Sequence, residues 1–173
     1  MDFSVSAYYL GTTKARFSER SSSKAGAELS RSNEENVIDQ VENAQLDGLI
    51  PMDGKGLSKV SGQDFQKIKG LSKVDLRISK YGARIVDQDM TTLDRIPLVN
   101  IVFTVAYDDG FERSNFVMVT KARHCEPEYR CLVFQCSSMR DADEFLKKIR
   151  QLFDSVIETV DRSRAEQEDW VDV

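Results

Sequence analysis

The sequence is poor in the residues that build most catalytic and metal sites. Among 173 residues it has one histidine, His124, and three cysteines, Cys125, Cys131 and Cys136. Their spacing does not match a zinc knuckle, and three of the four lie in or beside strand-like segments, so we expect strand or buried cysteines and no metal. A Cys–His catalytic pair would need a third, orienting group. Since no glycine-rich phosphate loop or other catalytic motif occurs, we expect neither an enzyme nor a cofactor.

Long apolar runs and a basic balance are missing as well. No stretch approaches the roughly 18 apolar residues of a membrane span, and the first residues lack the basic start and apolar core of a signal peptide. An odd number of cysteines crowded late in the chain argues against a secreted disulfide scaffold and indicates a reducing compartment. The net charge of −5 disfavours nucleic acid as the main partner, because phosphate contacts need a basic face.

Alternating apolar residues predict an antiparallel sheet of about seven strands. Residues 3–11 alternate, and further strands are expected at 74–79, 83–87, 91–94, 99–107, 115–121 and 129–135. The pattern at 99–107 is the strongest, and its apolar residues are expected to share one face: Val99, Ile101, Phe103, Val105 and Tyr107. Asp108-Asp109-Gly110 is typical of a hairpin turn. Strands joined by short turns favour an antiparallel meander.

A first helix is expected over residues 34–49. Val37, Val41, Ala44 and Gly48 share one face there, Ser32 or Asn33 would cap its start, and Pro51 would end it. Residues 17–33 and 52–70, which are rich in serine, glycine and charge, are expected to be loops, the second with one short turn near Phe65.

A second, longer helix is expected over residues 139–162. Its apolar residues keep helical spacing for more than five turns, and Ser138 with Asp141 resembles a capping box. The residues after it are acidic. We therefore predict one domain over residues 1–162 and a flexible acidic tail over 163–173.

The order of these elements resembles the pleckstrin-homology/phosphotyrosine-binding (PH/PTB) superfold. Tyr9-Leu10-Gly11 is similar to the Tyr-Leu-Gly of many PTB domains, and residues 131–134 look like their final strand. Residues 44–48, 79–82, 107–110 and 153–156 are similar to the integrin cytoplasmic-domain-associated branch of the family. The resemblance covers about residues 3–157. It implies an α+β fold, an antiparallel β-sandwich with an early helix and a long C-terminal helix that caps one end.

The resemblance also implies a mechanism. Such domains are adaptors that bind Asn-Pro-x-Tyr-type peptides by adding them to the edge of the fifth strand, here residues 98–107. The implied partners are integrin β tails or a Krev-interaction-trapped scaffold, without a need for phosphotyrosine, in the cytoplasm at the inner face of the plasma membrane or in the nucleus. The implied peptide-contact residues are Leu98, Ile101, Val102, Phe103, Ile149, Leu152 and Phe153. A plain core role is an open alternative for them, because an alternating strand must bury one face.

The sequence also contains two groups of charged residues that could bind a partner. By the resemblance, Glu42 and Asp47 on the first helix would face basic residues of the scaffold, although ordinary helix-surface carboxylates would look the same. Arg77, Lys80 and Arg84 form a candidate anion patch, which keeps open an alternative function as a phosphoinositide- or anionic-lipid-binding module with weak peripheral membrane contact. Basic residues at this density also occur on ordinary solvated faces.

Overall fold

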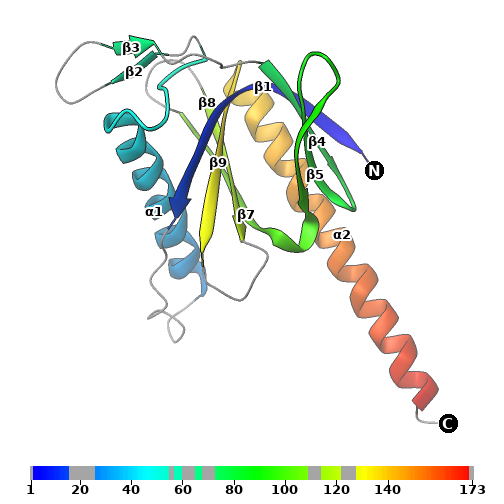
Figure 1. The fold of residues 1–173 in the computed structure, drawn as a ribbon. Coiled ribbons are helices and arrows are strands. Elements are labelled where there is room, and N and C mark those ends of the chain that lie inside the picture. Colours follow the sequence, from blue (N-terminus) through cyan, green and yellow to red (C-terminus); the bar gives the residue numbers. More distant parts are fainter. Residues whose placement is uncertain are drawn as a thin grey trace.

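Seven strands form one antiparallel sheet in the order β6-β5-β4-β1-β9-β8-β7, with a helix on each side (Figure 1). The computed structural model describes residues 2–15, 26–54, 57–59, 65–67, 73–108, 114–121 and 128–171. The strands of the sheet are β1 (Phe3–Ala15), β4 (Lys73–Ser79), β5 (Gly82–Val86), β6 (Thr92–Pro97), β7 (Ile101–Asp108), β8 (Ser114–Lys121) and β9 (Tyr129–Cys136). The helices are α1 (Gly26–Leu46), α2 (Met139–Val171) and a short 3-10 turn, η2 (Leu98–Asn100). The expected α+β sandwich is confirmed.

β1 joins the two halves of the sheet. Its first residues, 3–8, pair with β4, and residues 7–15 pair with β9. The register slips between Tyr9 and Gly11, where Gly11 has a φ of 134°. A β-bulge of this kind inserts one extra residue and exchanges the two sides of the strand. Ala7 therefore packs in the cluster beneath α2, whereas Ala15 packs in the cluster beneath α1.

The core has two parts, one on each face of the sheet. Beneath α2, the rings of Phe116 and Phe134 are fully buried, and Phe145 of the helix meets Phe116 edge-on at 5.2 Å between ring centroids. Beneath α1, valines dominate, with Val37 and Val41 of the helix and Val117 of β8 among the fully buried residues. Figure 1 shows α1 and α2 on opposite sides of β7, β8 and β9.

α1 is longer than the sequence predicts and ends by a different device. It begins at Gly26, so the expected caps at Ser32 and Asn33 are wrong, because the serine-rich segment before them is already helical. Its end is a Schellman motif around Gly48, which has a φ of 78°. The N–H of Leu49 donates to the carbonyl of Ala44 at 2.9 Å, and that of Gly48 donates to the carbonyl of Gln45 at 3.2 Å.

Two further elements differ from expectation. The predicted loop at 52–70 contains a small hairpin of β2 (Leu57–Lys59) and β3 (Phe65–Lys67). α2 continues past the expected end at Arg162 to Val171, since its last residues are mostly good helix formers. Its predicted start is confirmed, because the N–H of Asp141 donates to Ser138 Oγ at 3.2 Å. The division into a domain over 1–162 and a tail over 163–173 stays a prediction.

Two glycines with positive φ predict different costs of substitution. Gly48→Ala strains a left-handed helix end and should lower the free energy of unfolding by about 1 kcal/mol. Gly82 has a φ of 135°, and a Cβ there would collide with the backbone carbonyl of Ile96, so Gly82→Ala should cost more than about 3 kcal/mol. Urea unfolding of both variants measures the difference. Equal losses would show that the turn before β5 relaxes freely.

Candidate functional site

The outer edge of β7 is an open edge of the sheet. Among the described residues, β7 pairs with β8 alone, from Ile101 opposite Thr120 to Asp108 opposite Ser114. An edge strand leaves a row of backbone N–H and C=O groups unpaired on its outer side. β7 is the fifth strand of the main sheet, so the structure places an open edge where the resemblance expected one.

A bulge divides β7 close to its start. The register shifts between Ile101 and Phe103, and Val102, the residue between them, is 45% exposed. Because an extra residue reverses the alternation, Ile101 packs in the cluster beneath α2, while Phe103 and Val105 pack in the cluster beneath α1. The predicted single face over residues 99–107 is therefore wrong. Val99 lies outside the strand, in η2, and is 91% exposed.

α2 forms the wall beside this edge. It packs against β7, and Figure 1 shows the connection from β6 to β7 next to the middle of α2. Phe153 of α2 and Leu98 of η2 are both half-buried and pack against the same core cluster. They therefore lie at its margin, where a partner can reach them, and Val102 is exposed on the strand.

The predicted contact residues thus fall into two groups. The side chains of Ile101, Ile149 and Leu152 are buried, with exposed fractions of 6%, 2% and 5%. They therefore pack in the core, which is the alternative that the sequence left open. Leu98, Val102, Phe103 and Phe153 keep some exposed surface. On β7, the bulge at Val102 places Ile101 and Phe103 on opposite faces, and no sequence pattern predicts this bulge.

The predicted charged residues lie elsewhere on the molecule. Glu42 on α1 and Asp47 just after it are both exposed. Arg77 and Arg84 are direct neighbours across β4 and β5. Lys80 lies in the turn after β4, with its ammonium 5.1 Å from the centroid of the Tyr81 ring. The structure adds Arg95 on β6, which is the neighbour of Arg84, and strand register of this kind cannot be predicted from the sequence.

The cysteines that the structure describes are structural. Cys131 and Cys136 are buried in β9, as predicted. Burial raises the pKa of the Cys131 thiol to about 12, and burial with the nearby Asp141 carboxylate raises that of Cys136 to about 11. Both thiols are therefore protonated at neutral pH and poor nucleophiles. No group of metal-binding side chains forms among the described residues, and the expectations for His124 and Cys125 fall outside them.

An open seven-stranded antiparallel sheet with a C-terminal helix beside its edge strand is the arrangement of the PH/PTB superfold, so the protein is a PTB-type domain. A family model described as "Beta-1 integrin binding protein" matches residues 31–162, and the chain belongs to this family. The family is described by binding and not by catalysis, in agreement with the expectation of a non-enzymatic protein.

Two curated relatives agree with the family. The chain is 34% identical over 129 residues to integrin beta-1-binding protein 1 of Mus musculus, which covers 73% of this chain and 56% of that protein. It is 28% identical over 123 residues to the protein of the same name from Bos taurus, which covers 70% and 54%. The chain thus spans about half the length of the curated relatives it matches.

No described helix is long and apolar enough to cross a membrane.

Burial of the two described cysteines predicts their reactivity. In a Cys125→Ser variant, only Cys131 and Cys136 remain, and neither should react with a disulfide reagent at about pH 8 while the protein is folded. Their raised pKa values keep the thiolate fraction low, and burial blocks access. Unfolding in urea should release both. Rapid reaction of either thiol in the folded variant would contradict the assignment, and a melting curve checks that the variant is folded.

Proposed function

We propose that this chain is an intracellular adaptor that binds cytoplasmic integrin β tails by adding an Asn-Pro-x-Tyr-type peptide as an extra strand to β7. The observation that carries the proposal is the open edge of β7 beside α2. The names of its relatives support the choice of partner, since both are integrin beta-1-binding proteins. The proposed location is the cytoplasm, at the inner face of the plasma membrane, with the nucleus as a second compartment.

The two open edges of the sheet differ in a way that favours β7. β6 carries the exposed charges Asp94 and Arg95 and ends at Pro97, which has no N–H to donate. Charged residues and proline are devices that protect an edge against further pairing. β7 has no charged residue before Asp108. An incoming strand would meet charged side chains and a missing donor at β6, and would meet neither at β7 before Asp108.

The bulge at Val102 suggests where regular pairing stops. Backbone groups of the peptide would pair with β7 from Phe103 onward, which supplies affinity without sequence preference. At the bulge the ladder is interrupted, so the peptide would turn there. We define the apolar margin as the exposed Val102 with the half-buried Leu98 and Phe153, and the tyrosine side chain of the peptide would pack there and supply specificity.

The same margin favours an unphosphorylated tyrosine. Leu98, Val102 and Phe153 are apolar, and an apolar surface offers a phosphate no charge-assisted hydrogen bond. A phosphate held there would lose water without a replacement for it. Phosphorylation of the peptide is therefore expected to weaken binding.

A scaffold with basic residues is the proposed second partner. Glu42 and Asp47 are exposed near the C-terminal end of α1, and the last turn of α1 contains no basic residue. The partial negative charge of the helix end is therefore not compensated within that turn. The two carboxylates and the helix end together favour a cationic partner such as a Krev-interaction-trapped scaffold.

Placing a charge on the β7 edge should weaken peptide binding. Val102→Asp puts a carboxylate at the bulge, and binding of an unphosphorylated integrin β tail peptide, followed by fluorescence polarisation, should weaken at least about tenfold. Leu93→Asp is the matched control, because Leu93 lies on the opposite edge strand and is 49% exposed, close to the 45% of Val102. Equal affinity of the two variants would contradict the assignment of β7 as the peptide-binding edge.

Hydrogen exchange tests the strand addition directly. On binding of the peptide, those backbone amides of residues 103–108 that point away from β8 should gain protection, because the ladder extends on their side, while those of β6 should not change. A loss of affinity in Phe153→Ala that exceeds its loss of stability would place Phe153 at the interface. Protection that spreads over β6 and β7 alike would point to general stabilisation and not to strand addition.

Phosphorylation of the peptide provides a separate test. The tyrosine-phosphorylated tail peptide should bind several-fold more weakly than the unphosphorylated one, because the apolar margin cannot pair with the phosphate. A matched Tyr→Phe peptide controls for the hydroxyl and should bind about as well as the parent. Tighter binding of the phosphopeptide would contradict the proposal that the tyrosine packs against an apolar margin.

A further inference from the structure

α2 has two flanks, one on each side of the stripe of residues that it buries against the sheet. One flank faces β1, because Asp141 and Lys148 line a hollow of about 270 Å³ together with Ser4 and Ser6 of β1. Ser155 follows Lys148 by seven positions and therefore lies on the same flank, since an α-helix has 3.6 residues per turn. The flank on the side of β1 is thus polar.

The other flank, on the side of β7, is mostly apolar. Leu146 and Phe153 are seven positions apart, and both are half-buried against the core cluster beneath α2. Ile157 follows Phe153 by four positions, so these three side chains lie within about 40° of one another around the helix axis. Arg150 stands before Phe153, but the flank is uncharged from Phe153 to Ile157. Ile157 is 56% exposed, which is more than the 45% of Val102 in the apolar margin.

α2 and the peptide of the proposed complex run in the same direction. Asp108 at the end of β7 is opposite Ser114, which is opposite Cys136 at the end of β9, and α2 begins shortly afterwards at Met139. α2 therefore runs from the end of β7 toward its start. In an Asn-Pro-x-Tyr peptide the tyrosine comes last, and it packs at the apolar margin near the start of β7. The residues after the tyrosine would thus leave the site where α2 continues beyond the sheet (Figure 1).

The distance between Phe153 and Ile157 fixes which peptide residue can reach Ile157. A helix rises by about 1.5 Å per residue, so Ile157 lies about 6 Å beyond Phe153 along α2. An extended peptide advances by about 3.3 Å per residue, so two residues after the tyrosine cover this distance. An apolar side chain at that position would cover Ile157 and remove apolar surface of both from water.

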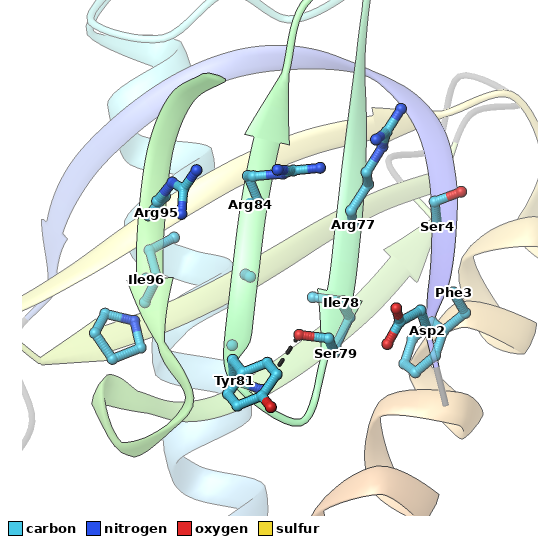
Figure 2. A pocket seen from close by; sticks show the side chains of 13 residues that line it. Asp2, Phe3, Ser4, Arg77, Ile78, Ser79, Tyr81, Arg84, Arg95 and Ile96 are labelled. Carbon is cyan, nitrogen blue, oxygen red and sulfur yellow. Dashed lines mark hydrogen bonds between the residues drawn. The ribbon is translucent and has the colours of Figure 1, made fainter. Parts of the chain in front are cut away.

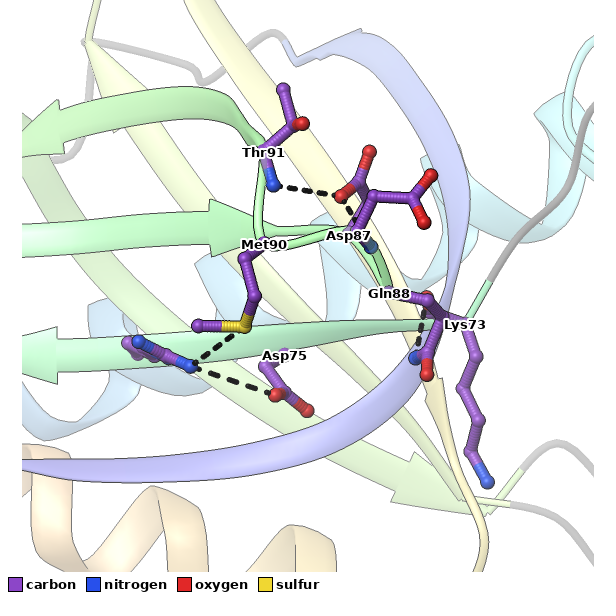
Figure 3. A network of polar contacts seen from close by, with 8 residues as sticks. Lys73, Asp75, Asp87, Gln88, Met90 and Thr91 are labelled. Carbon is purple, nitrogen blue, oxygen red and sulfur yellow. Dashed lines mark hydrogen bonds and ion pairs between the residues drawn. The ribbon is translucent and has the colours of Figure 1, made fainter.

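The surface before η2 in the chain is charged and offers a poorer path for such a residue. Arg84 of β5 and Arg95 of β6 line a hollow of about 680 Å³ on the face that Figure 2 shows. Arg77, the neighbour of Arg84, approaches Asp75 at 3.9 Å and the sulfur of Met90 at 3.8 Å (Figure 3). An apolar side chain placed over guanidinium groups would take water from them without replacing its hydrogen bonds. The flank of α2 is therefore the favoured path.

We propose that the flank of α2 from Phe153 to Ile157 is a docking surface for the residues that follow the tyrosine of the bound peptide, and that it selects an apolar side chain two positions after the tyrosine. The inference rests on the proposed function, because the direction of the peptide follows from its addition to β7. It identifies the preferred partners as Asn-Pro-x-Tyr segments that continue past the tyrosine with an apolar residue at this position.

Three synthetic peptides with one Asn-Pro-x-Tyr core test the proposal by fluorescence polarisation on the full chain. The first ends at the tyrosine, the second continues with three serines, and the third has leucine in place of the second serine. The leucine peptide should bind about three- to tenfold more tightly than the serine peptide, because part of its leucine side chain is buried. Ile157→Ser should remove this gain and leave the affinities for the other two peptides unchanged. Since isoleucine and serine have similar helix propensities, α2 should stay folded.

Met139→Ser is the matched control, because Met139 is 44% exposed at the opposite end of α2, and this variant should keep the gain. A gain that survives Ile157→Ser would overturn docking at this flank. An equal loss for all three peptides in Ile157→Ser would also overturn it, since Ile157 would then act on the apolar margin through the helix. Equal binding of the leucine and serine peptides by the unmodified chain would overturn the selectivity but leave the proposed function standing. Absence of binding by every peptide would refute the proposed function, and the inference with it.

Discussion

The slip in β1 between Tyr9 and Gly11 is the constraint on which the rest of the fold depends. In a regular strand, residues that are an even number of positions apart face the same side, yet Ala7 and Ala15 of β1 belong to clusters on opposite faces of the sheet. The extra residue exchanges its sides, so Ala7 packs beneath α2 and Ala15 beneath α1. β1 also pairs with β4 on one side and with β9 on the other, so it joins the two halves of the sheet.

The sheet has two open edges, β6 and β7, and an open edge carries a risk of unwanted pairing with other strands. Charges and Pro97 protect β6, whereas the protein leaves the first part of β7 uncharged. An apolar, unprotected edge is a liability for a protein that works alone. It is explained most simply if a partner strand covers it, and the position of α2 beside β7 supplies the side wall that such a partner needs.

The sequence predicts the parts of this fold that rest on periodicity. The strands of the main sheet and the start of α2 follow from alternation and from the cap at Ser138, since each depends on neighbours in the chain. Single-residue insertions are not predictable in this way. A bulge leaves the composition of β7 unchanged but moves Ile101 and Phe103 to opposite faces, and it is the reason why a uniform apolar pattern was wrongly assigned to one face.

The alignment of Arg95 with Arg84 and Arg77 escaped prediction for a related reason. Arg77 and Arg84 lie near one turn and can be paired from the sequence, but Arg95 joins them only through the register of β5 with β6. That register itself shifts between Ile85 and Val86. The start of α1 was missed for a different reason. Gly26 and two serines suggested a loop, although Ala27, Glu28, Leu29 and Arg31 are good helix formers, and the structure continues the helix there.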